Sequence, residues 1–107
     1  MVLNFRKMKT LLIVDDIPDN LRIISEHLKP DYRLMAAKEG EAALNLACAY
    51  GPDLILLDIM MPGIDGYEVC RRLKADPDTQ DIPVIFLSAK TDADNETEAL
   101  SLGAVED

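Results

Sequence analysis

The sequence of 107 residues contains no tryptophan, few aromatic residues and just two cysteines, Cys48 and Cys70. Two cysteines do not make a disulfide framework, and no Cys-x-x-Cys pair or Cys/His cluster indicates zinc. Both lie on helical stripes, where we expect inert core thiols. No apolar run approaches the roughly 20 residues that a membrane-spanning helix needs. We therefore expect a single soluble, cytoplasmic domain with an aliphatic core.

Basic residues are also scarce. The chain has 11 lysines and arginines against 20 aspartates and glutamates, and its net charge is −9. A surface of this sign repels the phosphates of nucleic acids and the head groups of anionic lipids. We therefore expect neither nucleic acid nor a membrane as a direct partner.

Four short apolar runs are the clearest pattern in the chain: residues 11–14, 32–36, 54–57 and 84–87. Three of them are apolar at every position, which is typical of strands buried on both faces of a parallel sheet. The second run keeps some alternation, as an edge strand does.

Helical patterns separate these runs. Pro18 suits the first turn of a helix that Pro30 stops, and a second helix over 40–50 ends at Gly51. Capping boxes start two further helices, one at Asp65 and one at Asn95. The order βαβαβαβα predicts an α/β fold, a doubly wound parallel sheet with helices on both faces and right-handed crossovers.

Polar side chains follow three of the predicted strands directly. Asp15 and Asp16 follow the first strand, Asp58 the third and Ser88 the fourth. The carboxyl ends of parallel strands share one edge of the sheet, and ligands bind there. We therefore expect three carboxylates and a hydroxyl to converge at this edge.

Converging carboxylates repel one another. Two unit charges 4 Å apart cost roughly 4 kcal/mol at an effective dielectric constant near 20. Protonation or a cation can relieve this repulsion. A few hard oxygen ligands without a closed cage suit Mg²⁺, which keeps several waters and favours a phosphate partner, and Mn²⁺ is an acceptable substitute. The pattern predicts a metal-assisted phosphoryl site in which one carboxylate acts as the nucleophile.

Three segments resemble the receiver domain of two-component response regulators: Ile13-Val14-Asp15-Asp16, the stretch 53–66 around Asp58, and residues 84–89. The resemblance runs from about Lys9 to Glu106. It implies a flavodoxin-like sheet of order 2-1-3-4-5. We expect residues 1–8 to be an N-terminal extension and residues 9–107 to be a receiver domain that ends before the family's fifth strand and last helix.

The resemblance also implies a role for each site residue. Asp58 corresponds to the phosphoryl acceptor, and Asp15 and Asp16 correspond to the acidic pair that holds Mg²⁺. Met60 occupies the position whose backbone carbonyl ligates the metal. Ser88 corresponds to the switch hydroxyl that turns toward the phosphoryl oxygens.

The implied partners are a sensor histidine kinase or phosphotransfer protein and an output domain. The stretch 66–83 is similar to receivers that precede cyclic-dinucleotide enzymes. The domain itself is not expected to be an enzyme, except that it assists its own phosphorylation and dephosphorylation.

Two alternatives remain open. The family's lysine at the end of the fifth strand has no counterpart here, since Lys90 follows Ser88 too closely. This leaves open an interaction fragment that is not phosphorylated. An aspartyl-nucleophile phosphatase of the haloacid dehalogenase type would need a second acid two residues after Asp58, where this chain has Met60.

An exposed apolar strand edge also predicts self-association. Without a fifth strand, the run 84–87 would be a free edge that can pair with another chain. We predict a homodimer formed through this edge or by exchange of residues 93–107. Light scattering at high protein concentration tests this, and a strict monomer would contradict it.

Overall fold

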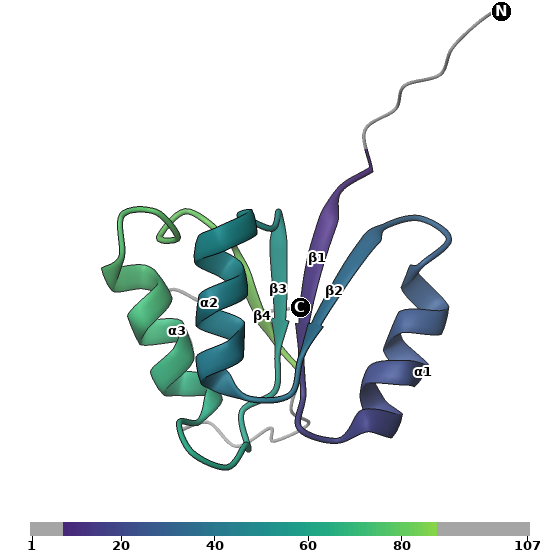
Figure 1. The fold of residues 1–107 in the computed structure, drawn as a ribbon, viewed down its shortest axis with the longest axis horizontal. Coiled ribbons are helices and arrows are strands. Elements are labelled where there is room, and N and C mark those ends of the chain that lie inside the picture. Colours follow the sequence, from purple (N-terminus) through teal and green to yellow (C-terminus); the bar gives the residue numbers. More distant parts are fainter. Residues whose placement is uncertain (1–7, 88–107) are drawn as a thin grey trace, which may run out of the picture.

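The computed structural model describes residues 8–87, and strands and helices alternate along them. The elements are β1 (Thr10–Val14), α1 (Pro18–Leu28), β2 (Arg33–Ala37), α2 (Gly40–Tyr50), β3 (Leu54–Leu57), α3 (Gly66–Ala75) and β4 (Val84–Phe86). The strands form one parallel sheet in the order β2-β1-β3-β4 (Figure 1). This confirms the predicted α/β fold and strand order. The helix predicted to start at Asn95 lies outside the described residues.

The register of the sheet brings the carboxyl ends of the strands together. Val14 of β1 pairs with Leu57 of β3 on one side and with Ala37 of β2 on the other. The strand arrows in Figure 1 all point toward the same edge, at the bottom of the view. The loops that follow β1 and β3 leave from this edge.

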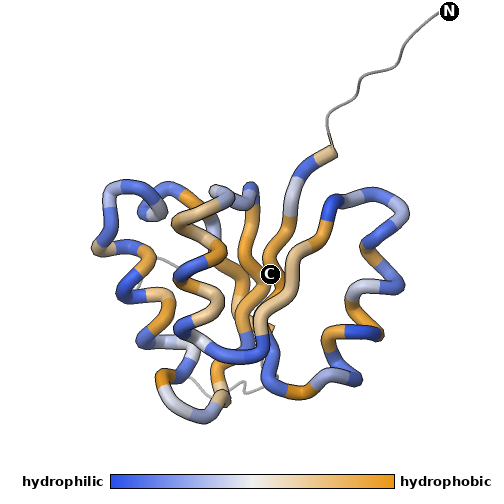
Figure 2. The backbone as a smooth tube through the Cα atoms, in the orientation of Figure 1, coloured by the Kyte–Doolittle hydropathy of each residue, from blue (hydrophilic) through white to orange (hydrophobic). Residues whose placement is uncertain are grey.

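One face of the sheet carries the buried core. Successive strand residues point to opposite faces, so Leu12 and Val14 share a face. They are fully buried together with Ile55, and the cluster includes Ala47 of α2 and Leu73 of α3. Figure 2 shows the sheet as the most hydrophobic part of the backbone. Helices α2 and α3 therefore cover this face.

The opposite face, on the side of α1, is less well covered. Leu54 and Leu56 of β3 are half-buried, although we expected full burial on both faces. With Ile85 of β4 and Leu28 of α1 they line an apolar groove. Within residues 8–87, α1 is the one helix on this side and it lies toward β2 (Figure 1). The described residues thus bury β1 on both faces but leave β3 half-covered.

The outer edge of β4 is where we predicted self-association. Among residues 8–87, β4 pairs with β3 alone. Dimerisation through this edge stays a prediction, and residues 93–107 lie outside the described part of the chain. Among the described helices, none has the length and apolarity to cross a membrane.

The helix ends follow the local sequence. Pro18 occupies the first turn of α1. Gly51 ends α2 in the left-handed conformation, with φ 56°, and its N–H donates to the carbonyl of Ala47 at 3.0 Å. The side chain of Asp65 caps α3 by accepting the N–H of Glu68 at 2.9 Å. The predicted start signals at Pro18 and Asp65 and the stop at Gly51 are confirmed.

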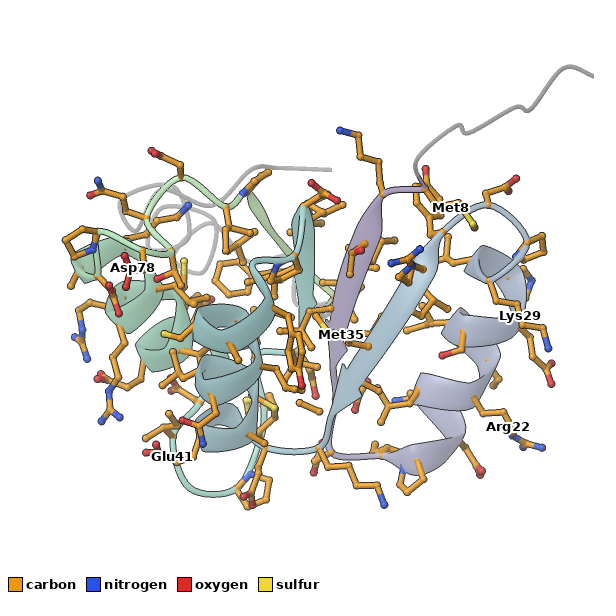
Figure 3. The ribbon with its side chains drawn as sticks, turned by 45° about the horizontal axis from the view of Figure 1, so that its top comes forward. Met8, Arg22, Lys29, Met35, Glu41 and Asp78 are labelled. Atoms are coloured by element: carbon orange, nitrogen blue, oxygen red, sulfur yellow. The ribbon has the colours of Figure 1, made fainter. Side chains whose placement is uncertain are left out.

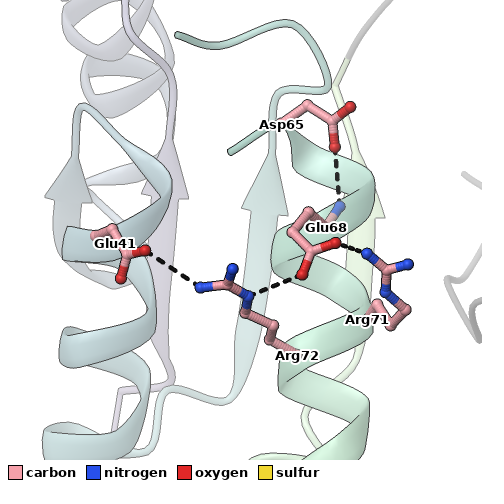
Figure 4. Close-up of polar contacts among 5 residues, drawn as sticks. All are labelled: Glu41, Asp65, Glu68, Arg71 and Arg72. Atoms are coloured by element: carbon pink, nitrogen blue, oxygen red, sulfur yellow. Dashed lines mark hydrogen bonds and ion pairs between the residues drawn. The ribbon is translucent and has the colours of Figure 1, made fainter. Parts of the chain in front are cut away.

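A chain of surface ion pairs joins α2 to α3 (Figure 4). Arg72 donates to Glu68 at 2.8 Å and reaches Glu41 of α2 at 3.2 Å. Arg71 pairs with the other oxygen of Glu68. Exposed pairs of this kind stabilise a fold by at most about 1 kcal/mol. Elsewhere on the surface, Arg22 of α1 and Lys29, which directly follows α1, project outward (Figure 3).

The two cysteines differ in their surroundings. Cys70 of α3 is fully buried, as expected, and burial raises the pKa of its thiol. Cys48 of α2 is exposed, so the prediction that it is a core thiol is wrong. Its Sγ lies 3.6 Å from Oδ2 of Asp76. Two causes raise the pKa of the Cys48 thiol: partial desolvation, which is the larger, and this contact with Asp76. The raised pKa values make both thiols less reactive, because the thiolate is the nucleophile.

Polar contacts, one of them buried, hold the connection between α3 and β4. Thr79 is 1% exposed, and its hydroxyl donates to the carbonyl of Leu73 at 2.7 Å. Lys74 donates to the carbonyls of Gln80 at 3.1 Å and Ile82 at 2.7 Å. These bonds satisfy backbone oxygens where α3 ends and bring the chain back to the start of β4.

We predict that Thr79→Val lowers the free energy of unfolding by about 1–3 kcal/mol, because it removes the shorter of two hydrogen bonds to the buried Leu73 carbonyl. The N–H of Asp76, at 3.4 Å, is the donor that stays. Thr79→Ser keeps the hydroxyl and serves as the control, with a smaller loss. Urea unfolding followed by circular dichroism measures both. Equal losses in the two variants would show that the hydroxyl bond does not matter.

Candidate metal centre

Three carboxylates meet at the carboxyl edge of the sheet. One oxygen each from Asp15, Asp16 and Asp58 lies within 4.8 Å of the others. Asp15 and Asp16 follow β1, and Asp58 follows the neighbouring strand β3. The structure thus brings together the three acids that the strand-end pattern predicts to converge.

Asp15 is the most enclosed of the three. It is 4% exposed, and its backbone N–H donates to the carbonyl of Ala37 at 3.1 Å. Its Oδ1 accepts the N–H of Ile17 at 3.0 Å, and its Oδ2 accepts the amide of Asn20 at 3.1 Å. A buried carboxylate needs such donors, since its loss of water would otherwise be very costly. Asp15 is therefore held at both oxygens by neutral groups.

Asp58 is positioned by the backbone on both sides. Its N–H donates to the carbonyl of Val14 at 2.9 Å, which extends the β1–β3 ladder by one residue. The N–H of Gly66, the first residue of α3, donates to the carbonyl of Ile59 at 2.8 Å. A Cβ on Gly66 would lie 2.3 Å from the carbonyl oxygen of Asp58. Only glycine permits this close approach of α3 to the loop that carries Asp58.

The two remaining predicted site residues are Met60 and Ser88. Met60 lies in the loop after β3, and the residue is 60% exposed, whereas its neighbour Met61 is buried. Its exposure is compatible with a role for the backbone alone. Ser88 lies outside the described residues. The last described residue, Leu87, donates its N–H to the carbonyl of Leu57 at 2.9 Å, at the edge where Asp58 lies.

The donor set suits a hard divalent cation. All three side chains offer carboxylate oxygens, which Mg²⁺ and Mn²⁺ prefer, and no thiol or imidazole belongs to the cluster. Asp16 and Asp58 are half-buried, so that water can complete a coordination shell. A cation would also relieve the mutual repulsion of the three acids. The cluster therefore fits Mg²⁺ or Mn²⁺ through Asp15, Asp16 and Asp58.

A comparison with protein families identifies the family to which this fold belongs. The model of the response regulator receiver domain matches residues 11–106. The chain belongs to this family. The resemblance seen in the three sequence segments is thereby confirmed, and the chain is a receiver domain of the two-component response regulator type.

Individual relatives agree with this assignment. A probable cyclic di-GMP phosphodiesterase of Vibrio cholerae is 47% identical over 97 residues, which are 91% of this chain and 22% of that protein. The solved N-terminal domain of a response regulator receiver protein from Methanoculleus marisnigri has 40% identity and a TM-score of 0.84, covering 91% of this chain and 80% of that one. The receiver thus spans about a fifth of the length of the curated relative.

A further solved neighbour bears on the metal. The Mn²⁺-bound form of the response regulator Rcp1 has 31% identity and a TM-score of 0.81 and covers 92% of this chain and 78% of that one. That receiver-type protein binds Mn²⁺, one of the two ions that the donor set of the acidic cluster fits.

Sequence reasoning overlooked two residues of the receiver's site. Asn20 sits in the first turn of α1, five residues after the acid that it contacts, and a polar residue there is usually solvated. Gly66 directly follows the predicted cap Asp65, so the sequence pattern indicates only the first residue of a helix. Both contacts join a helix N-terminus to a loop. The spacing of apolar residues along the sequence does not predict such contacts.

We predict that Gly66→Ala disturbs the backbone at Asp58. The new methyl group would overlap a backbone carbonyl, which cannot rotate away as a side chain can. We expect a loss of about 1–3 kcal/mol in the free energy of unfolding and a shifted Asp58 amide signal in ¹H–¹⁵N NMR spectra.

Gly40→Ala is the matched control. Its Cβ would meet the side chains of Ile64 and Val69, at 2.5 and 2.7 Å, and not the backbone of Asp58. It should cost stability while leaving the Asp58 amide signal nearly in place. An unshifted Asp58 signal in Gly66→Ala would contradict the assignment.

Proposed function

We propose that this receiver domain accepts a phosphoryl group on Asp58 in a Mg²⁺-dependent transfer from a sensor histidine kinase or phosphotransfer protein. The observation that carries the proposal is the cluster of Asp15, Asp16 and Asp58, whose carboxylate oxygens lie within 4.8 Å of one another. The family match over residues 11–106 supports the same assignment.

The reaction follows from the position of Asp58. One of its carboxylate oxygens attacks the phosphorus of a phosphohistidine, the new O–P bond forms an acyl phosphate, and the N–P bond breaks to release the imidazole. Transfer of this kind needs positioning and charge neutralisation more than covalent help. The backbone bond from Asp58 to Val14 holds the nucleophile at the sheet edge.

Asp15, Asp16, Asp58 and the backbone carbonyl of Met60 would hold the metal. Bound there, Mg²⁺ or Mn²⁺ would neutralise the charge that develops on the transferred group. The phosphoryl group itself adds about −1.5 to −2 of charge, which requires new hydrogen-bond donors. We assign Ser88 as one such donor, and this assignment rests on its place after the fourth strand.

The signal then passes to an output domain or another partner. The relative from Vibrio cholerae is named as a probable cyclic di-GMP phosphodiesterase, and its receiver-like part is 22% of its length. This supports a cyclic-dinucleotide enzyme as the class of output for the receiver described here. A cytoplasmic location, where kinase and output would meet, stays a prediction from the sequence.

The two alternatives make different demands on the site. A phosphatase of the haloacid dehalogenase type would need an acid at position 60, and Met60 cannot act as a general acid or base. An interaction fragment would not need the three acids to converge. Met60 therefore counts against a phosphatase, and the observed cluster counts against an interaction fragment.

The decisive experiment is phosphorylation by acetyl phosphate with Mg²⁺, read by intact-protein mass spectrometry. We expect one phosphoryl group on the parent chain and none on Asp58→Asn, because the amide is not a nucleophile. Asp31→Asn, at an exposed acid outside the cluster, should behave as the parent.

Each alternative has its own outcome. Catalytic release of phosphate from a small ester would identify a phosphatase. A parent chain that takes no label would identify an interaction fragment, and equal labelling of Asp58→Asn would assign the acceptor to another residue.

A further inference from the structure

Asn20 makes a side-chain contact with the acidic cluster from outside it. It is half-buried in the first turn of α1, and its Nδ2 donates to Oδ2 of Asp15 at 3.1 Å. The other oxygen of Asp15 accepts the N–H of Ile17 at 3.0 Å. Asp15 is 4% exposed, so little bulk water is available to orient its carboxylate. Asn20 and the backbone therefore fix its orientation together.

The type of donor is significant. A carboxylate oxygen has two acceptor sites, so one hydrogen bond to each oxygen of Asp15 leaves capacity for a metal or its waters. An amide satisfies the buried oxygen without bringing a charge. A lysine or arginine at the same place would also donate, but its charge would offset that of the acids and compete with a cation.

Helix capping does not account for the asparagine at this position. The side chain of Asn20 does not cap α1, whose N-terminal cap residue is Ile17. Within residues 8–87, the side chain of Asn20 donates its hydrogen bond to Asp15.

We propose that Asn20 is a positioning residue for the metal site: its neutral amide orients Asp15 while preserving the negative charge that the cation needs. The proposal rests on the proposed function, because it assumes that a divalent cation binds the cluster. It adds a residue of α1 that acts through its hydrogen bond to Asp15.

The test is Mn²⁺ binding to the full 107-residue chain. Binding is measured as the loss of the electron paramagnetic resonance signal of free Mn²⁺. Asn20→Leu removes the donor at similar volume. We expect its Mn²⁺ affinity to fall about tenfold, which equals about 1.4 kcal/mol. The control Asn45→Leu, at an exposed position of α2, should bind as the parent does.

A second variant separates orientation from charge. Asn20→Lys keeps a donor for Asp15, so its free energy of unfolding should equal or exceed that of Asn20→Leu, while its Mn²⁺ affinity should be lower still. A purely structural role for Asn20 would instead make affinity follow stability in the two variants. If Asn20→Leu does not fold, Asn20→Ala replaces it, with circular dichroism as the check on folding.

The outcomes distinguish this proposal from the one on which it rests. If the parent chain binds no Mn²⁺, the metal-dependent function fails and the role of Asn20 fails with it. If the parent binds Mn²⁺ and folded Asn20→Leu or Asn20→Ala binds equally well, only the positioning role is overturned. A loss in Asn20→Leu together with a larger loss in Asn20→Lys supports it.

Discussion

The parallel pairing of β1 with β3 is the constraint on which the site depends. The register places Val14 opposite Leu57, and the bond from the N–H of Asp58 to the carbonyl of Val14 continues that ladder into the loops. A shift of β3 by one residue would turn every side chain of that strand to the other face of the sheet. It would displace Asp58 relative to Asp15 and Asp16 and would also take Ile55 out of the core. Packing of the core therefore maintains the alignment of the acids.

The acids work against the stability that the sheet provides. Three carboxylates within 4.8 Å repel one another, and one of them is almost fully buried. The chain compensates with neutral donors at Asp15 and leaves the charge in place. Gly66 lets α3 start against the backbone of Asp58 and Ile59, so the loop that carries Asp58 is held from a second direction. This combination of rigid support and three converging carboxylates suits the proposed site for a cation and a phosphoryl group.

Much of the fold could be predicted because it depends on local patterns. The run 54–57 coincides with β3, and the predicted stop at Gly51 and cap at Asp65 are where α2 ends and α3 begins. The second run is displaced by one residue from β2, since Tyr32 lies before the strand. Two expectations about burial were wrong. Cys48 is exposed, and Leu54 and Leu56 are half-covered, because burial depends on which elements lie over a residue and not on its own hydrophobicity.

The sequence by itself determined the alternation of strands and helices, the family and the three acids at the strand ends, because each of these is written in contiguous residues. Parallel topology then implies that strand ends meet, so even the convergence of Asp15, Asp16 and Asp58 could be predicted. Only the tertiary structure decided how the acids are supported. The contact of Asn20 with Asp15 and the approach of Gly66 to Asp58 depend on distances between a helix and a loop. Those distances arise from the packing of helices on the sheet, which no short stretch of sequence encodes.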